Sequence, residues 1–200
     1  STVAIGKEAL RLNTTGVNMV AVGMEALEHN TTGKHNVAIG GFALVQNTTA
    51  DANVAVGINV LQANTTGASN TAVGGFALDA NTTASYNTAV GYGSLGANTT
   101  GNLNTAVGYL AATAVTTGVQ NTAVGEQALS GVTTTNNNTA VGYRAMTVAG
   151  AAECTALGTQ ALNACSGSEN TSVGWQSGVN VSSGSFNVMM GYQAGKTCTT

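Results

Sequence analysis

The side chains able to do acid–base or nucleophilic chemistry are few in this chain, and their spacing forms no catalytic pattern. The only histidines, His29 and His35, occupy loop positions and do not recur. The eight carboxylates are scattered singly, with no pair suited to general acid–base or glycosidase chemistry. No Ser-His-Asp set, phosphate-binding loop or metal-ligand spacing occurs. The sequence therefore predicts no enzyme, no catalytic residue, no metal and no cofactor.

The three cysteines, Cys154, Cys165 and Cys198, lie in the last quarter of the chain. An odd number of cysteines without a C-x-x-C spacing is typical of neither a zinc site nor a closed set of disulfides. A bridge between Cys154 and Cys165, bonds between chains, and free buried thiols all stay open.

Composition excludes several classes of partner. Only 13 of 200 residues are charged, the net charge is −3, and no basic patch could neutralise phosphates, so we expect no nucleic-acid binding. No apolar stretch approaches the ~20 residues needed to span a bilayer. The chain has 27 glycines, no proline and abundant Asn, Thr, Val and Ala, which favours strands and turns over a compact globule.

A tandem repeat organises the whole sequence. Glycines that end V-A-I-G or T-A-V-G segments recur at 17-residue spacing for eight steps, then at 16, 16 and 17. We number positions from this glycine, position 0. The twelve repeat glycines are Gly6, Gly23, Gly40, Gly57, Gly74, Gly91, Gly108, Gly125, Gly142, Gly158, Gly174 and Gly191.

Each copy predicts one coil of a β-solenoid. In residues 70–86, N-T-A-V-G suits a short strand, x-x-A-L offers a second, and A-N-T-T with its neighbours forms a turn. Helical repeats need about 33 to 47 residues, so a helical solenoid is excluded. We expect an all-β parallel β-solenoid of about twelve coils, a single array over residues 1–200 that belongs to a longer fibre protein.

The positions of the charges predict which positions are buried. None of the 13 charges lies between −4 and 0, or at +3 or +4. Because burying an unpaired ion is costly, we expect these positions to face the interior. Positions −1 (aliphatic) and −3 (Val or Thr) share one strand face, which is predicted to fill the core.

Position −2, on the opposite strand face, is Ala in the first ten copies. A solvated face would vary, so this face is predicted to pack against another chain. The residues assigned to interchain packing are Ala38, Ala55, Ala72, Ala89, Ala106, Ala123 and Ala140.

Two further rows carry binding hypotheses. Aromatic residues at +1 form a candidate glycan or receptor contact stripe, although packing would also explain them; they are Tyr92, Tyr109, Tyr143, Trp175 and Tyr192. The N-T-T runs at +7 fit the glycosylation sequon, but stacked Asn and Thr ladders are favoured because the repeat produces the sequon automatically. Rows of Thr also raise an ice-binding alternative, opposed by their adjacent placement in a turn.

The N-[TV]-A-[VI]-G-x-x-A-L core resembles the head repeat of YadA-like trimeric autotransporter adhesins, with Thr2–Gly6 and Asn36–Gly40 matching closely. Similar N-T-A-V-G-Y-x-A-L…N-T-T-G arrays look like those of phage and viral tail fibres. The resemblance implies a left-handed β-roll, a homotrimer, and an extracellular adhesive or shaft role on a virion or a bacterial surface. The repeat is longer than the family's, which bears on the cross-section.

Overall fold

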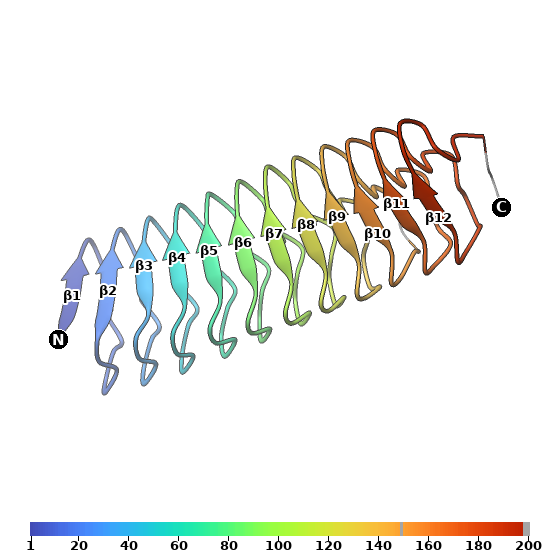
Figure 1. Cartoon of the computed structure of the whole chain (residues 1–200). Helices are drawn as coiled ribbons and strands as arrows, with labels where there is room; N and C mark the ends of the chain where they lie inside the picture. Colours follow the sequence, from blue (N-terminus) through green and yellow to red (C-terminus); the bar gives the residue numbers. More distant parts are fainter. Residues whose placement is uncertain (149, 198–200) are drawn as a thin grey trace.

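The chain folds as a stack of coils, each of which adds one short strand to a twelve-stranded parallel sheet (Figure 1). This is a computed structural model, and it describes residues 1–148 and 150–197. The strands are β1 (Thr2–Ile5), β2 (Met19–Val22), β3 (Val37–Ile39), β4 (Val54–Val56), β5 (Thr71–Val73), β6 (Thr88–Val90), β7 (Thr105–Val107), β8 (Thr122–Val124), β9 (Thr139–Val141), β10 (Thr155–Leu157), β11 (Thr171–Val173) and β12 (Val188–Met190).

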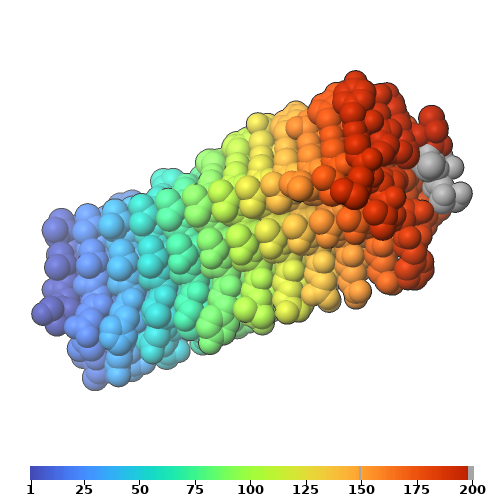
Figure 2. Space-filling model, viewed as in Figure 1, coloured from blue at the N-terminus to red at the C-terminus, as the bar shows by residue number. Residues whose placement is uncertain are grey.

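Strand register follows the sequence repeat. Each strand pairs with the strands before and after it in chain order, so that Ala72 lies opposite Ala89 and Ala89 opposite Ala106. Equivalent positions of successive repeats therefore stack along an elongated body, with β1 and β12 at opposite ends (Figure 2). The all-β parallel solenoid is confirmed; the left hand of the coil and the homotrimer stay predictions.

Only one strand forms in each coil, so the second strand predicted for x-x-A-L is wrong. The segment after the repeat glycine is a run of turns, in which positions +2 and +4 adopt positive φ, as at Phe76 (58°) and Leu78 (50°). Left-handed residues bend the chain too sharply for extended pairing. Coils still bond to one another here through the backbone, for example from Leu78 N–H to the Ser94 carbonyl at 3.1 Å.

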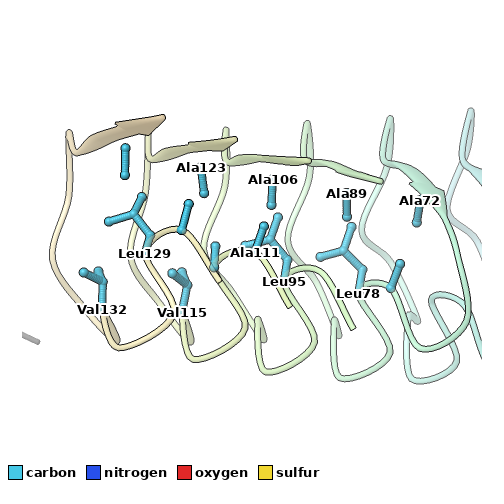
Figure 3. Close-up of a cluster of buried hydrophobic side chains, with 14 of the residues drawn as sticks. Ala72, Leu78, Ala89, Leu95, Ala106, Ala111, Val115, Ala123, Leu129 and Val132 are labelled. Carbon is cyan, nitrogen blue, oxygen red and sulfur yellow. The ribbon is translucent and has the colours of Figure 1, made fainter. Parts of the chain in front are cut away.

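The core is a narrow seam between the sheet and these turns. In Figure 3, the alanines of the strands point towards leucines that come from the opposite wall of the coil. Ala89 and Ala106 at position −2 and Leu78 and Leu95 at position +4 all have 0% exposure. Position +4 is Leu in most coils, so it supplies the bulk of the core and leaves room for only a methyl group from the strand.

The predicted orientation of the strand faces is therefore wrong. The −2 residues assigned to interchain packing point into their own chain's core and have no surface that a partner could contact. The −1 and −3 residues, expected to fill the core, lie on the outer face of the sheet. All seven alanines that were assigned to interchain packing have 0% exposure: Ala38, Ala55, Ala72, Ala89, Ala106, Ala123 and Ala140.

The distribution of charges predicted burial correctly at four positions. The charge-free positions −4, −2, +3 and +4 are buried in the middle coils, as Asn87, Ala89, Ser94 and Leu95 show. Positions −3 and −1 lack charges but are exposed or half-exposed, as at Val90. Burial inside the chain's own core therefore does not explain why these two positions carry no charge.

Asparagine side chains form two ladders through the core. At position +7, Asn64 Nδ2 donates to Asn47 Oδ1 at 3.2 Å, and Asn81 Nδ2 donates to Asn64 Oδ1 at 2.8 Å. At position −4, Asn70 Oδ1 accepts from the Asn87 backbone N–H at 3.0 Å. Because these side chains are buried, each bond satisfies a polar group that would otherwise be costly to bury. The ladder predicted for the N-T-T runs is confirmed.

A substitution in the middle of the +7 ladder should lower the free energy of unfolding more than a substitution at its end. In Asn64→Val, the buried Asn47 Oδ1 loses its donor, so we expect about 1–3 kcal/mol of destabilisation in thermal or denaturant unfolding. Asn98→Val is the control. It removes the Asn98 Oδ1, which has no hydrogen-bond partner, and leaves the Asn81 Oδ1 without its donor, so the number of buried unpaired oxygens stays the same. Equal losses in the two variants would contradict the ladder's energetic role.

Candidate functional site

The outer face of the sheet is an uncharged surface that runs the length of the solenoid. Position −1 places an aliphatic side chain on this face in every coil, with exposures of 40% at Ile39, 36% at Val90 and 37% at Val107. Position −3 adds Val or Thr beside it. No charged residue occurs at either position in any repeat. An uninterrupted aliphatic row on an uncharged face is unusual for a surface that only meets water.

The aromatic row at +1 lies on the surface but is not one continuous stripe. Tyr92 stacks on Tyr109 with ring centroids 5.9 Å apart, and Trp175 stacks on Tyr192 at 5.0 Å. Tyr143 stands between these pairs, separated from them by coils that carry Glu126 and Thr159 at +1. All five predicted contact residues are exposed, so the row could meet a ligand through two stacked pairs and one single ring.

A polar groove of about 270 Å³ opens on the turn segments of three coils. It is formed by positions +2 and +5 of three successive coils, and its lining contains only polar side chains. The lining residues are Gln127, Ser130, Arg144, Thr147, Gln160 and Asn163.

Hydrogen bonds hold the groove's side chains in place. Arg144 Nε donates to Gln127 Oε1 at 2.7 Å, which ties the guanidinium to one wall. Asn163 Nδ2 donates both to the Arg144 carbonyl at 2.9 Å and to Thr147 Oγ1 at 2.8 Å. Gln160 Oε1 accepts from Gln176 at 2.7 Å, so the row continues past the groove.

Arg144 has no carboxylate partner within residues 1–148 and 150–197. The ion pairs of this part of the chain are Lys7–Glu8 and Arg11–Glu28. The Arg144 Cζ lies 5.4 Å from the centroid of the Tyr143 ring, which is a cation–π contact. Of the two arginines in the sequence, Arg11 is therefore neutralised and Arg144 is not.

Three carboxylates that the sequence analysis treated as scattered come together near the N-terminus. Carboxylate oxygens of Glu8, Glu25 and Glu28 lie within 4.8 Å of one another, because residues one repeat apart are stacked neighbours. Arg11 Nε donates to Glu28 Oε1 at 2.8 Å, and this hydrogen bond lowers the pKa of Glu28. The expectation of isolated carboxylates is wrong here, but an acidic group on the surface is common without any ligand.

Cys154 and Cys165 are free, buried thiols that lie against each other. Cys154 replaces the position −4 asparagine, and its Sγ accepts the Asn170 backbone N–H at 3.3 Å as the amide oxygen does elsewhere. The hydrogen bond between the two thiols lowers the pKa of Cys165 to about 7 and raises that of Cys154. Cys198 lies outside the described residues. Of the three alternatives, the structure has free thiols at the first two cysteines.

The N-T-T loops are poorly suited to carry a glycan or to bind ice. Five of their asparagines, from Asn30 to Asn98, have 0% exposure and use their amides in the ladder. The first threonine of each run bonds to the next coil, as Thr31 Oγ1 does to the Thr48 carbonyl at 3.0 Å. Hydroxyl groups that donate to backbone carbonyls in this way are not available as an array for binding ice.

Comparison with known proteins gives no family. The chain matches no family model, no curated protein and no solved structure. Within the residues that the structure describes, no helix is long and apolar enough to cross a membrane.

The groove is the feature that sequence analysis missed. Its residues come from three repeats and share no short motif, so only stacking brings them together. A signal was present, however: position +2 changes from Phe76 and Leu110 in earlier coils to Gln127, Arg144 and Gln160. Such a change at one position of a repeat indicates a part of the surface with a different chemical character.

Proposed function

We propose that this chain is a non-enzymatic fibre segment, a shaft or adhesive head that works outside the cell on a virion or a bacterial surface. It associates with further copies of itself through the outer face of the sheet, and its exposed aromatic row is offered to a cell-surface receptor. Its mechanical role follows from continuous backbone bonding between coils, which makes a solenoid stiff along its axis.

The uncharged outer face of the sheet is the observation that carries this proposal. Aliphatic side chains at −1 line it from Ile5 to Met190, and both of these end residues are more than half exposed. Removing such area from water is worth roughly 25 cal/mol per Å². A covered face also explains why −1 and −3 avoid charge although they lie outside the chain's own core.

A second copy of the chain is the partner that fits this face best. The face repeats once per coil from end to end, so identical chains can align coil by coil over their whole length. Symmetric association of identical surfaces is the commonest route to oligomers. A homotrimer, which the resemblance to trimeric adhesins implies, would enclose one such face per chain around a common axis.

Light scattering of the purified chain tests self-association. We expect three times the chain's 19.7 kDa. The variant Val90→Lys/Val107→Lys/Val124→Lys places three charges on the outer face, and it should dissociate to monomers because burying unpaired ammonium groups is costly.

The matched control adds the same three charges elsewhere. Thr83, Thr100 and Thr117 occupy exposed turn positions in the same region of the stack, so replacing them with Lys should leave the particle mass unchanged. Circular dichroism should show both variants folded. A native chain that is monomeric at all concentrations, or equal behaviour of the two variants, would overturn self-association.

The receptor-binding part of the proposal has a separate test. Replacing Tyr109 and Tyr143 with Ala removes exposed rings without touching the core. Binding to cells or immobilised glycans should fall if the row is a contact surface. Unchanged binding by this variant would leave the chain a spacer that carries another binding domain.

One observation favours ice binding as a second candidate. From β5 to β11, seven successive strands place Thr at −3 on the outer face, beside the aliphatic −1 residue. These threonines are distinct from those of the N-T-T turns. A regular array of hydroxyl and methyl groups on an open sheet suits an ordered water surface. Thermal hysteresis by a monomeric chain would support this candidate, and a trimer that covers the face would exclude it.

A further inference from the structure

The polar groove and its unpaired arginine have no part in self-association through the sheet. The groove belongs to the turn segment of the coil, at positions +2 and +5, whereas the outer sheet face is formed by positions −3 and −1. Three successive coils contribute to it. Two of the three, those that begin at Gly142 and Gly158, are one residue shorter than most.

The chemistry of the lining indicates the class of ligand. Amide and hydroxyl groups from five side chains surround the guanidinium of Arg144, so the groove offers mainly hydrogen-bond donors and acceptors. Its volume of about 270 Å³ is below the range of about 300–1,000 Å³ common for larger ligands. A single sugar ring matches this size and density of hydroxyl groups.

The positive charge of Arg144 indicates that the ligand of the groove is an anion. Only Nε of Arg144 is used in the bond to Gln127, so the outer nitrogens of its planar fork can engage a carboxylate in bidentate fashion. No acidic side chain of the described residues forms an ion pair with it. The exposed ring of Tyr143 is not part of the groove lining, but its centroid lies 5.4 Å from the Arg144 Cζ.

We propose that this groove binds a carboxylate-bearing sugar, in which Arg144 pairs with the carboxylate and Gln127, Gln160 and Asn163 bind the ring hydroxyls. The inference rests on the receptor-binding part of the proposed function and does not depend on self-association. It identifies acidic glycans as the receptor chemistry that this segment recognises.

Ligand-observed NMR titration tests the proposal with methyl glucuronide and methyl glucoside, which differ only in the carboxylate. The native chain should bind the glucuronide more tightly. Arg144→Gln should weaken glucuronide binding about ten- to hundredfold and leave the glucoside unchanged, as expected for the loss of a charged hydrogen bond. Lys34→Gln, which removes an exposed positive charge far from the groove, is the control and should bind as the native chain does.

Three results would overturn the proposal. The two sugars could bind alike, Arg144→Gln could bind glucuronide as well as the native chain does, or glutarate could compete as well as the sugar. The last result would mean a simple anion contact without recognition of the ring. Light scattering on the same samples reports self-association separately, so a chain that trimerises but does not bind glucuronide would refute this inference alone.

Discussion

Replacing Gly91 with Ala should destabilise the solenoid by about 2–6 kcal/mol, the largest effect that we expect from a single methyl group. Gly91 has φ of 129°, a conformation that favours glycine. A Cβ atom there would lie 2.4 Å from the Gly108 carbonyl oxygen and 2.7 Å from its carbon. Both atoms belong to the backbone of the next coil, which its own sheet bonds hold in place, so neither can move away cheaply.

Gly41→Ala is the matched control for this prediction. A Cβ atom at Gly41 would meet nothing within 4 Å, and its backbone does not have positive φ. Thermal unfolding followed by circular dichroism should therefore leave Gly41→Ala within a few tenths of a kcal/mol of the native chain. If Gly91→Ala were equally harmless, the close stacking of successive coils at the repeat glycine would be incorrect.

The sequence repeat predicted the architecture because stacking is periodic. Coils of 17 residues place equivalent positions next to one another, so the glycine spacing alone gave the parallel register of all twelve strands. The Asn ladder followed from the same argument, since stacked amides can satisfy each other. Within each coil, local propensity was a weaker guide. The A-L segment looked like a strand, but Leu95 takes a φ of 50° because it must turn into the core.

Alternation along a strand separates two faces but does not say which one is inside. The aliphatic residues at −1 were assigned to the core because no charge occurs at that position in any repeat. In this coil the interior is filled from the opposite wall by Leu78 and its equivalents, leaving room only for Ala72 and the other strand alanines. Threonine at −3 in the later repeats was the available sign that this face pointed outwards.

The groove could not be derived from spacing because its residues meet only through stacking of particular coils. Thr147 and Asn163 are 16 residues apart and form a hydrogen bond, but neither belongs to the consensus. In a repeat protein, departures from the consensus are more informative about binding than the consensus itself. The column at +2 shows this, since its members from Gln127 onwards are Arg or Gln, where the earlier ones are apolar or acidic apart from Asn59.

Ala106→Asp should destabilise the chain by about 3–5 kcal/mol, because it places an unpaired carboxylate in the closed core. Ala106 has 0% exposure and faces leucine side chains, so no water or cation can reach the new group. Burial raises the carboxyl pKa above its ordinary value, and the folded state then binds a proton more tightly than the unfolded state. Part of the lost stability should therefore return as the pH is lowered through that raised pKa.

Val107→Asp, one residue further along the same strand, separates the two faces of the sheet. Val107 is 37% exposed, so its replacement should change the stability of an isolated chain by less than about 1 kcal/mol, with little dependence on pH. It should, however, weaken self-association, because the carboxylate would be buried against another copy. Unfolding and light scattering on both variants therefore give opposite patterns. The reverse pattern, a tolerant Ala106 and a sensitive Val107 in the monomer, would mean that the strands face the other way.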